Sequence, residues 1–303
     1  MCEQQNFSIL PSEQRITEYK TINIFKRSIG ENIDDEVVTS FGEEWLKFHA
    51  FQDNELEKLG KEYFDIVDDT ILNKNTYVLD MGCGSGRYSK YIASKVGFIE
   101  AMDPSDAVGA ANVLLKDVPN VRISKSSVDN IPFANNTFDF VMTIGVLHHI
   151  PDTLNAMKKC VEKVKQGGFF YVYLYYALDN RSLLFRFLFQ LTNLLRLGVS
   201  SMPHGIKKFF CDMLAVVLYM PLILLGRILY RCGFKKAAIS LPLSNYQNKS
   251  FFIIRNDALD RFGTKLEQRF SKVKIEEMMI NCGLSNINFS NNEPYWHAIG
   301  KKS

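Results

Sequence analysis

The feature that most constrains the fold of this chain is a glycine-rich turn that follows a short apolar run. Residues 78–87 read Val-Leu-Asp-Met-Gly-Cys-Gly-Ser-Gly-Arg, with a glycine at every second position from 82 to 86. At the carboxyl end of a parallel strand, main chain without side chains lets a ligand lie close to the backbone. We therefore expect a ligand site at this turn.

Apolar runs of strand length alternate with amphipathic stretches of helix length from about residue 76 onward. This alternation predicts a parallel sheet with helices on both of its faces. A serine cap at position 271 and a glycine at position 283 then bound one further helix. The strands that we expect span residues 76–81, 98–102, 121–125, 138–144, 169–177, 286–290 and 295–300.

Residues 181–236 break the alternation, because they are both basic and apolar. They hold nine Lys and Arg residues and one Asp, a net charge of +8, whereas the rest of the chain carries 27 basic and 32 acidic residues. The uncharged run at 213–225 contains Pro221 and is shorter than the roughly 20 apolar residues of a membrane-spanning helix. Together with an amphipathic stretch at 182–197, it predicts contact with an anionic membrane surface. The alternative is a helical cap whose apolar faces pack on each other and on the sheet.

Composition limits the class of protein. Hydrophobic residues make up 47% and charged residues 23% of the 303 residues, as in an ordinary folded protein, which excludes a collagen-like, disordered or polytopic membrane chain. The basic residues lie among leucines, which does not favour nucleic-acid binding. Six cysteines without short spacing predict reduced thiols and no zinc site, and the polar N-terminal segment predicts a cytoplasmic location, at the inner face of the membrane if the basic segment docks there.

The glycine turn and the residues after it resemble the class I S-adenosylmethionine-dependent methyltransferases, in the methyltransferase type 11 or ubiquinone-biosynthesis-like branch that carries a D-x-G-C-G-x-G loop. The resemblance covers residues 77–175 with the motifs in family order. It implies an α/β, Rossmann-like sheet of seven strands, mostly parallel with the last strand antiparallel, flanked by helices and carrying an inserted helical subdomain. It also implies S-adenosyl-L-methionine as the cofactor and no metal ion.

The resemblance also implies which residues bind the cofactor. The acid that ends the second strand, Asp103, would accept hydrogen bonds from both ribose hydroxyls, although it can otherwise cap the helix that begins near Ser105. At the adenine, the Val128 backbone would act with either Ser127 or Asp129. The full set of expected cofactor-binding residues is Asp80, Gly82, Cys83, Gly84, Gly86, Asp103, Pro104, Ser127, Val128, Asp129 and Ile144.

Two adjacent histidines follow the fourth expected strand, where family members place groups that face the transferred methyl group. Either His148 or His149 could act as a general base near neutral pH. The aromatic residues at 41–45 would form a helix that closes over the cofactor, or would simply pack as a terminal helix.

These observations predict four segments and one activity. The segments are an N-terminal helical cap at 1–75, a cofactor-binding core at 76–180, a basic apolar helical insertion at 181–256 and a completion of the core sheet at 257–303. The activity is methyl transfer to an oxygen, nitrogen or carbon nucleophile of a small or lipid-linked acceptor, such as a polyprenyl-linked sugar, a quinone precursor or a lipid. A nucleotide-binding protein without turnover is one alternative. The other is an NAD(P)-dependent oxidoreductase, which the glycine spacing opposes because position 87 is Arg.

Overall fold

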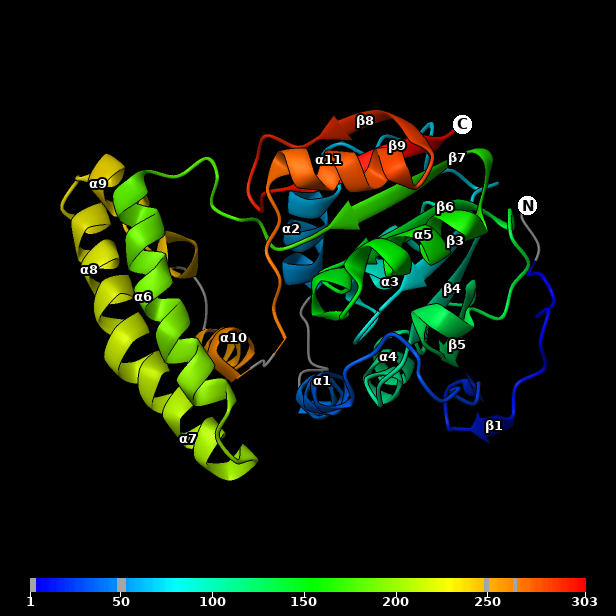
Figure 1. Cartoon of the computed structure of the whole chain (residues 1–303), viewed down its shortest axis with the longest axis horizontal. Helices are drawn as coiled ribbons and strands as arrows, with labels where there is room; N and C mark the ends of the chain where they lie inside the picture. Colours follow the sequence, from blue (N-terminus) through cyan, green and yellow to red (C-terminus); the bar gives the residue numbers. More distant parts are fainter. Residues whose placement is uncertain (1–3, 48–52, 248–250, 264–265) are drawn as a thin grey trace. The chain divides into compact units, whose positions relative to one another are not determined.

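The chain forms two compact units in a computed structural model that describes residues 4–47, 53–247, 251–263 and 266–303. One unit comprises residues 1–179 together with 266–303, and the other comprises residues 180–265 (Figure 1). The insertion expected at 181–256 therefore continues to residue 265 as a structural unit, because the helix Phe251–Gly263 belongs to it.

The first unit is built on one nine-stranded sheet. The central strands pair in parallel, and β9 is antiparallel to both of its neighbours, as the Rossmann-like methyltransferase sheet requires. The order across the sheet is β1-β2-β5-β4-β3-β6-β7-β9-β8. The strands are β1 (Glu13–Ile16), β2 (Thr21–Ile24), β3 (Tyr77–Met81), β4 (Phe98–Asp103), β5 (Val121–Lys125), β6 (Phe138–Ile144), β7 (Val164–Tyr173), β8 (Leu284–Phe289) and β9 (His297–Lys302).

The sheet has two strands more than the seven expected. β1 and β2 form an antiparallel pair in the N-terminal segment, and β2 extends the sheet by pairing in parallel with β5. The sequence does not reveal them, because β1 is exposed along its whole length and has no apolar alternation. The segment 1–75 is therefore partly strand rather than wholly a helical cap.

β7 begins five residues before the expected strand at 169–177 and contains the glycine pair at 167 and 168, which follows the preceding helix closely. That helix ends at Lys163, and the strand starts at Val164. A Cβ atom at Gly168 would lie 2.8 Å from the main-chain oxygen of Asp139. Gly168 is thus needed because β6 and β7 approach closely where their pairing register shifts.

The helices of the first unit cover both faces of the sheet. Side chains of α5 and α11 pack on one face, and those of α3 and α4 pack on the other. The helices are α1 (Asp35–Lys47), α2 (Asp53–Tyr63), α3 (Arg87–Ile92), α4 (Val108–Leu114), α5 (Thr153–Lys163) and α11 (Lys272–Asn281), with short 3₁₀ turns η1 (Val128–Asn130) and η2 (Leu147–His149).

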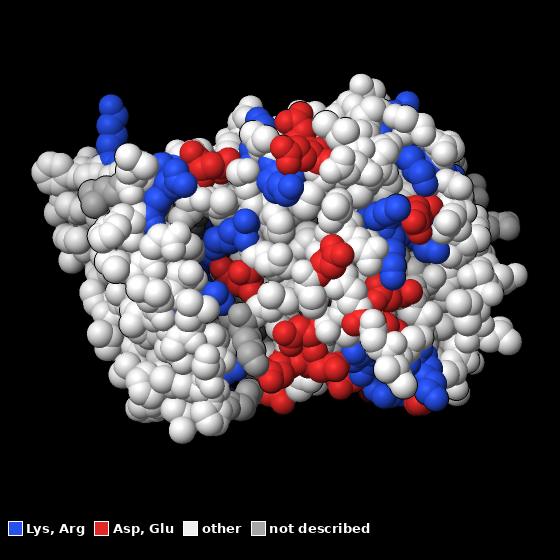
Figure 2. All heavy atoms as spheres, viewed as in Figure 1, with Lys and Arg blue, Asp and Glu red and all other residues white. Residues whose placement is uncertain are grey.

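The second unit consists of helices joined by short turns in its described residues and has a small core of its own, formed by residues such as Cys211, Tyr219 and Ile254. The helix that contains Pro221 is not interrupted there. A π-helical turn, η3, precedes the proline, and the helix continues through residues 204–231. Few charged side chains appear on the face of this unit seen in Figure 2. Its helices are α6 (Leu183–Ser200), α7 (His204–Leu214), η3 (Ala215–Tyr219), α8 (Met220–Arg231), α9 (Lys235–Ser240), η4 (Ser244–Tyr246) and α10 (Phe251–Gly263).

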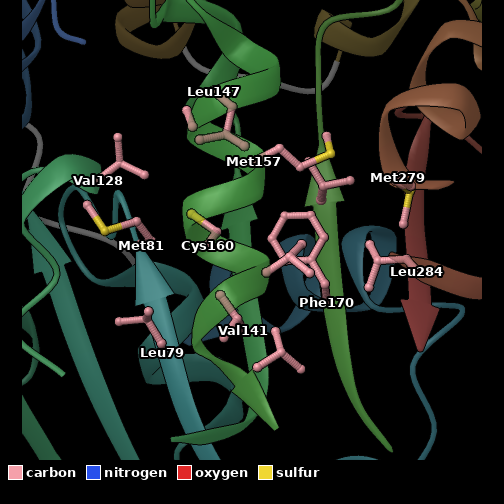
Figure 3. Packing of buried hydrophobic residues seen from close by; sticks show 14 of the residues in the cluster. Leu79, Met81, Val128, Val141, Leu147, Met157, Cys160, Phe170, Met279 and Leu284 are labelled. Atoms are coloured by element: carbon pink, nitrogen blue, oxygen red, sulfur yellow. The ribbon is translucent and has the colours of Figure 1, made fainter. Parts of the chain in front are cut away.

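The core of the first unit explains why its central strands read as continuous apolar runs. Leu79 and Val141 belong to the apolar cluster on the face covered by α5 and α11, to which Met157 and Met279 also belong (Figure 3). The alternate residues of the same strands, such as Val78, pack on the opposite face. Because helices cover both faces, every position of β3 is buried, and its carboxyl end is the only part that opens to a ligand loop.

Candidate functional site

The glycine loop leaves the carboxyl end of β3, which lies between β4 and β6 at the point where the strand order reverses. Ligands of open α/β sheets bind at such a reversal. The loop turns over the end of β4, because the backbone N–H groups of Gly82 and Cys83 both donate to the oxygen of Met102, at 2.7 and 2.9 Å. Gly82, Gly84 and Gly86 all have positive φ angles, of 81°, 53° and 80°.

The three glycines differ in what a side chain would meet. A Cβ atom at Gly82 would lie 2.3 Å from a methyl group of Val146, and one at Gly86 would lie 2.7 Å from a methyl group of Leu115. These two glycines are therefore needed for packing. At Gly84 the nearest atom is Nε1 of Trp45, at an ordinary contact distance of 3.4 Å. Gly84 thus presents bare main chain to the inner side of α1.

The expected ribose-binding acid lies directly against this main chain. Oδ2 of Asp103 accepts a hydrogen bond from the backbone N–H of Gly84 at 2.9 Å. Its Oδ1 accepts from the backbone N–H and the hydroxyl of Ser105, at 2.9 and 2.5 Å, so the carboxylate also fixes the turn that contains Pro104. Burial raises the pKa of Asp103. The structure therefore brings together the two residues on which the predicted cofactor pocket depends.

Asp80 offers a second buried carboxyl group at the end of β3. Its Oδ2 accepts a hydrogen bond from the hydroxyl of Ser89 at 2.7 Å. Burial, with a contribution from the nearby Asp103 carboxylate, raises the pKa of Asp80 to about 7, although the Ser89 hydroxyl opposes the shift. A cation beside Asp80 would favour its ionised form. This chemistry fits the ammonium group of an amino-acid moiety.

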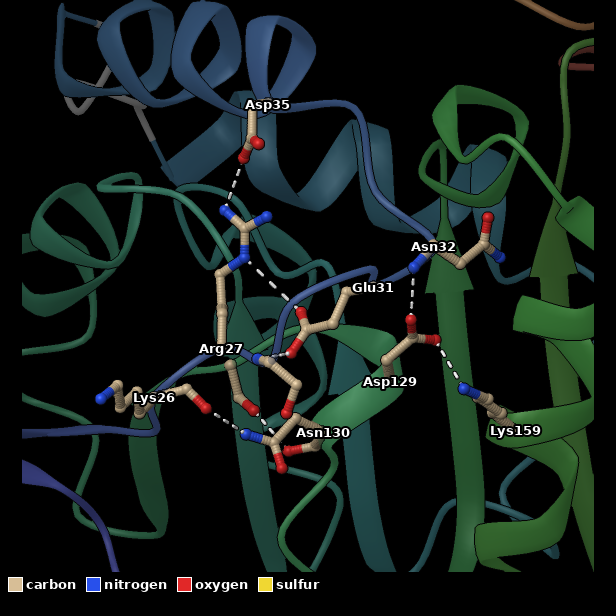
Figure 4. Close-up of polar contacts among 10 residues, drawn as sticks. Lys26, Arg27, Glu31, Asn32, Asp35, Asp129, Asn130 and Lys159 are labelled. Carbon is tan, nitrogen blue, oxygen red and sulfur yellow. Dashed lines mark hydrogen bonds and ion pairs between the residues drawn. The ribbon is translucent and has the colours of Figure 1, made fainter.

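The two residues expected as alternatives at the adenine position, Ser127 and Asp129, have different surroundings. Asp129 is engaged by the chain itself, since it accepts from Lys159 at 2.8 Å and from the backbone N–H of Asn32 (Figure 4). The Ser127 hydroxyl is buried and has no hydrogen-bond partner among the residues that the structure describes. Val128 is buried in the core next to it. Of the two alternatives, Ser127 is therefore the one with an unused polar group.

The paired histidines lie on η2, just beyond Ile144, which is itself buried at the end of β6. His149 Nδ1 lies 2.8 Å from the main-chain oxygen of Leu266. His148 Nδ1 accepts a long hydrogen bond, 3.4 Å, from the backbone N–H of Tyr175. The His148 ring stacks on the Tyr175 ring with centroids 3.8 Å apart, and burial holds the pKa of His148 well below its usual value.

Helix α1 contacts both parts of the site. Phe41 packs against His149 with ring centroids 4.9 Å apart, and the ring of Trp45 lies over Gly84. The guanidinium of Arg87, which begins α3, lies 4.7 Å from the centre of the Trp45 ring. The aromatic residues of α1 therefore occupy the position of the predicted covering helix.

The sequence did not point to the segment that returns from the second unit. The backbone N–H of Gln268 donates to the oxygen of His148 at 3.0 Å, so this segment runs along the histidine turn. Arg269 lies 5.3 Å from the centre of the Tyr175 ring and pairs with the buried carboxylate of Glu267 at 2.7 Å. The only sequence signal for this arrangement is two opposite charges with one residue between them, which is too common to be informative.

The donor set of this site fits S-adenosylmethionine. The main chain at Gly84 would accept the ligand closely, Asp103 would hold the ribose, and Asp80 would pair with the amino group. The Ser127 hydroxyl, which has no hydrogen-bond partner in the described part of the chain, would supply a polar contact at the adenine position. These four positions come from the ends of three neighbouring strands, β3, β4 and β5.

Comparison with known proteins places this part of the chain. A family model described as a methyltransferase domain matches residues 79–172. A ubiquinone biosynthesis O-methyltransferase of Coxiella burnetii is 24% identical over 143 residues, which are 46% of this chain and 61% of that protein. A demethylmenaquinone methyltransferase of Listeria monocytogenes is 32% identical over 104 residues, 32% of this chain and 44% of that protein. The chain thus spans less than two thirds of the length of either relative.

A solved structure is similar over a larger part of the chain. It is the complex between the Haloferax volcanii Trm112 methyltransferase activator and the methyltransferase, with a TM-score of 0.50 and 11% identity, covering 86% of this chain and 97% of that chain. At this identity the likeness concerns the fold alone. The family match, together with the contact between Asp103 and the bare main chain at Gly84, identifies residues 79–172 as a class I S-adenosylmethionine-dependent methyltransferase domain.

Proposed function

We propose that the whole chain is an S-adenosylmethionine-dependent methyltransferase that acts on a nucleophile of a small or lipid-linked acceptor. The observation that carries the proposal is the 2.9 Å hydrogen bond between Asp103 and the main chain of Gly84, at the strand reversal. When bound, S-adenosylmethionine supplies a methyl group on a positively charged sulfur atom. Because that group is already activated, the chain has mainly to align the nucleophile and to exclude water.

Three parts of the chain would carry out these tasks. Asp103 would hold the ribose and Asp80 the amino group of the cofactor, so that its orientation is fixed. Trp45 and Phe41 of α1 would keep water from the glycine loop and from the histidines. His149 would accept a proton from a hydroxyl nucleophile, whereas an amine or a carbanion could react by alignment alone.

Calorimetric titration with S-adenosylhomocysteine and with NADH tests the cofactor. We expect S-adenosylhomocysteine to bind and NADH not to bind. The reverse result would favour an NAD(P)-dependent oxidoreductase. Incubation with labelled methyl donor and lipid extracts, followed by mass spectrometry, tests turnover. Cofactor binding without any labelled product would indicate a nucleotide-binding protein that has lost activity.

We also propose that residues 180–265 dock on the cytoplasmic face of a membrane and give the enzyme access to an amphiphilic acceptor. This unit exposes many large apolar side chains although it has a core of its own. A large exposed apolar patch marks an interaction site in a folded protein, and we infer that these side chains form such a patch. Leu183, Phe187, Leu194, Phe209, Val217 and Phe234 are each more than 60% exposed.

Charge favours a lipid surface as the partner. Arg181, Arg186, Arg231, Lys235 and Lys236 of this unit are exposed, and each basic residue near an anionic membrane contributes about 1 kcal/mol. The buried Arg196 does not take part.

A helix lying in the plane of the membrane fits the distribution of charge along the chain. The structure joins α7, η3 and α8 into one apolar helix, Gly205–Arg231, which is 27 residues long and therefore passes a length test for spanning a bilayer. The uncharged stretch at its centre, residues 213–225, is only about 20 Å long at 1.5 Å per residue, against about 30 Å of hydrocarbon. Spanning would bury Asp212 or Arg227, whereas in-plane docking leaves both at the polar interface.

Flotation with vesicles tests this proposal. The full chain should float with vesicles of phosphatidylcholine and phosphatidylglycerol and should float less with phosphatidylcholine alone. Serine at Leu194, Phe209 and Val217, each 66% exposed, should abolish flotation. The matched control carries serine at two exposed apolar positions of the first unit, Val273 and Ile280, 64% and 57% exposed. If both variants float like the wild type, the unit does not dock through these side chains.

A further inference from the structure

The segment that leads into the covering helix α1 is fastened to the core at Asn32. The side-chain amide of Asn32 bonds both backbone groups of Asp152. Its Nδ2 donates to the oxygen of Asp152 at 2.7 Å, and its Oδ1 accepts from the N–H of Asp152 at 2.8 Å. The backbone N–H of Asn32 donates to Oδ2 of Asp129 (Figure 4). These bonds join Asn32 to residues that lie 97 and 120 positions further along the chain.

Both partners of Asn32 are fixed to helix α5. Asp152 is the N-cap of α5, because its side chain accepts from the backbone N–H of Asn155 at 3.0 Å. Oδ1 of Asp129 accepts from Lys159, which lies on the same helix, at 2.8 Å. Asp129 also lies in η1, the turn at the expected adenine position. Asn32 therefore anchors the segment before α1 to the frame of the cofactor site.

Helix α1 begins almost directly after this anchor. Oδ1 of Asp34 accepts from the backbone N–H of Val37 at 3.1 Å, so Asp34 caps the first turn two residues beyond Asn32. Arg27 adds an ion pair to Asp35 at 2.7 Å, which is largely exposed and therefore contributes little. We therefore expect the bonds of Asn32 to determine where the first turn of α1 lies.

The far part of α1 lies closely over the site. A Cβ atom at Gly42 would lie 3.1 Å from the backbone nitrogen of Asp106 and 3.3 Å from Cβ of Ser105. α1 therefore packs closely on the turn that holds the Asp103 carboxylate. Trp45, over the glycine loop, is eleven residues from the cap of α1, about 16 Å along the helix at 1.5 Å per residue. A tilt of about 5° at the first turn would move Trp45 by about 1.4 Å, and a misplacement of about 1 Å can cost a factor of about 10² in rate.

We propose that Asn32 is a positioning residue, which keeps Trp45 over the glycine loop and thereby sets how long S-adenosylmethionine stays bound. A cofactor that binds against this loop, under α1, can leave only when α1 moves aside. The bonds of Asn32 oppose that movement where the helix is attached to the core. This inference rests on the proposed function, because it takes the ligand of the loop to be the methyl donor.

Asn32→Ala, with Asn120→Ala as its matched control, tests the proposal. Asn120 is half-buried like Asn32 and precedes β5, so it lies at the amino ends of the strands, away from the site. Its Nδ2 donates to the oxygens of Ala93, Val96 and Gly97 at 2.9, 3.2 and 3.2 Å. Both variants should therefore lose stability in urea unfolding, by similar amounts. Only Asn32→Ala should change the behaviour of the cofactor.

Stopped-flow measurements with S-adenosylhomocysteine, followed by the fluorescence of Trp45, give the rate of cofactor release. The chain has two tryptophans, so a Trp296→Phe background leaves Trp45 as the reporter. We expect Asn32→Ala to raise the rate constant of release about tenfold, the worth of one hydrogen bond, and Asn120→Ala to leave it unchanged.

Quenching of Trp45 by acrylamide in the free protein measures the position of α1 without any ligand. It should increase in Asn32→Ala, because α1 then leaves the loop more often, and should stay unchanged in Asn120→Ala. Asn32→Asp serves as a second variant in case Asn32→Ala does not fold. It keeps the shape of the side chain but turns an oxygen toward the main-chain oxygen of Asp152, so it should also speed release and increase quenching.

The outcomes separate the inference from the proposed function. Release and quenching like those of the wild type in the Asn32 variants would overturn the inference. An equal change in Asn120→Ala would also overturn it, because the effect would then follow from lost stability alone. If the wild type does not bind S-adenosylhomocysteine, the proposed function fails instead, and the quenching of Trp45 still shows whether Asn32 holds α1.

Discussion

Replacement of Gly84 by alanine should damage cofactor binding more than stability. At φ 53° an added Cβ costs about 1–2 kcal/mol of backbone strain. It costs little more in packing, because its nearest neighbour, Nε1 of Trp45, lies at an ordinary 3.4 Å. The methyl group would occupy the space in which the ligand must approach the main chain. We therefore expect the affinity for S-adenosylhomocysteine to fall more than tenfold, about 1.4 kcal/mol or more, and to be lost in Gly84→Val.

Gly82→Ala should show the reverse pattern. It carries a similar backbone strain at φ 81°, but its Cβ would lie 2.3 Å from a methyl group of Val146. Overpacking of this kind adds about 1–3 kcal/mol, which gives a total loss of about 2–5 kcal/mol in stability. Gly283→Ala isolates the strain, because Gly283 has φ 83° and nothing lies within 4 Å of its added Cβ.

Urea unfolding and calorimetric titration with S-adenosylhomocysteine measure the two effects on the same samples. The expected ranking of lost stability is Gly82→Ala above both Gly84→Ala and Gly283→Ala. The expected loss of affinity is confined to Gly84→Ala among variants that remain folded. A Gly84→Ala protein that binds S-adenosylhomocysteine like the wild type would refute the placement of the pocket.

Three further predictions concern titration, fluorescence and the buried ion pair. The pKa of Asp80 is raised from a usual 3.8 to about 7, chiefly by burial, so stability in urea unfolding should be lost as the pH rises from about 4 through 7. The affinity for S-adenosylhomocysteine, measured by calorimetry, should increase between pH 6 and 8. Both trends should disappear in Asp80→Asn. Binding of S-adenosylhomocysteine should change the fluorescence of Trp45 in a Trp296→Phe background, and an unchanged spectrum on saturation would contradict the contact of α1 with the site. Asp65→Ala should cost about 1–3 kcal/mol in urea unfolding, because Nε2 of the buried His297 loses its carboxylate partner at 2.6 Å. Burial raises the pKa of Asp65, but hydrogen bonds from His297 and neighbouring side chains outweigh this effect and lower it. The difference in stability from the wild type should therefore vanish as the pH falls through that lowered pKa.

The sequence was sufficient to predict the bounds of strands whose apolar pattern matches their burial on both faces of the sheet. β5 and β6 have the predicted bounds, and β3 and β4 differ from the prediction by one residue at one end. These strands are buried on both faces, so their apolar runs are unambiguous. β1 could not be predicted, because an exposed four-residue edge strand has no such run. The π-helical turn that precedes Pro221 could not be predicted either, because no local sequence signal announces it.

Contacts across long stretches of chain decided the candidate site, and the sequence alone does not supply them. The sequence left Ser127 and Asp129 as alternatives at the adenine, because the contacts that engage the Asp129 carboxylate come from Lys159 and from Asn32, which is 97 residues away in the sequence. The sequence could not distinguish the roles of His148 and His149, because the main-chain oxygen that His149 Nδ1 contacts belongs to Leu266, 117 residues further along the chain. Spacing within a motif therefore located the site but could not distinguish neighbouring residues within it.

Asp103 can both fix the turn at Ser105 and bind a ribose, but the turn and the ribose hydroxyls would compete for the same carboxylate oxygen atoms. A carboxylate offers about four acceptor positions. Three are in use, by the backbone N–H of Gly84 and by the N–H and hydroxyl of Ser105. Two ribose hydroxyls would therefore need one of these bonds to be released. The Ser105 hydroxyl is the group that can rotate away, because the two N–H groups are fixed by the main chain. If Asp103 binds the ribose, as we propose, the turn at Ser105 would hold the carboxylate in place before the cofactor arrives and would give up one bond when it binds.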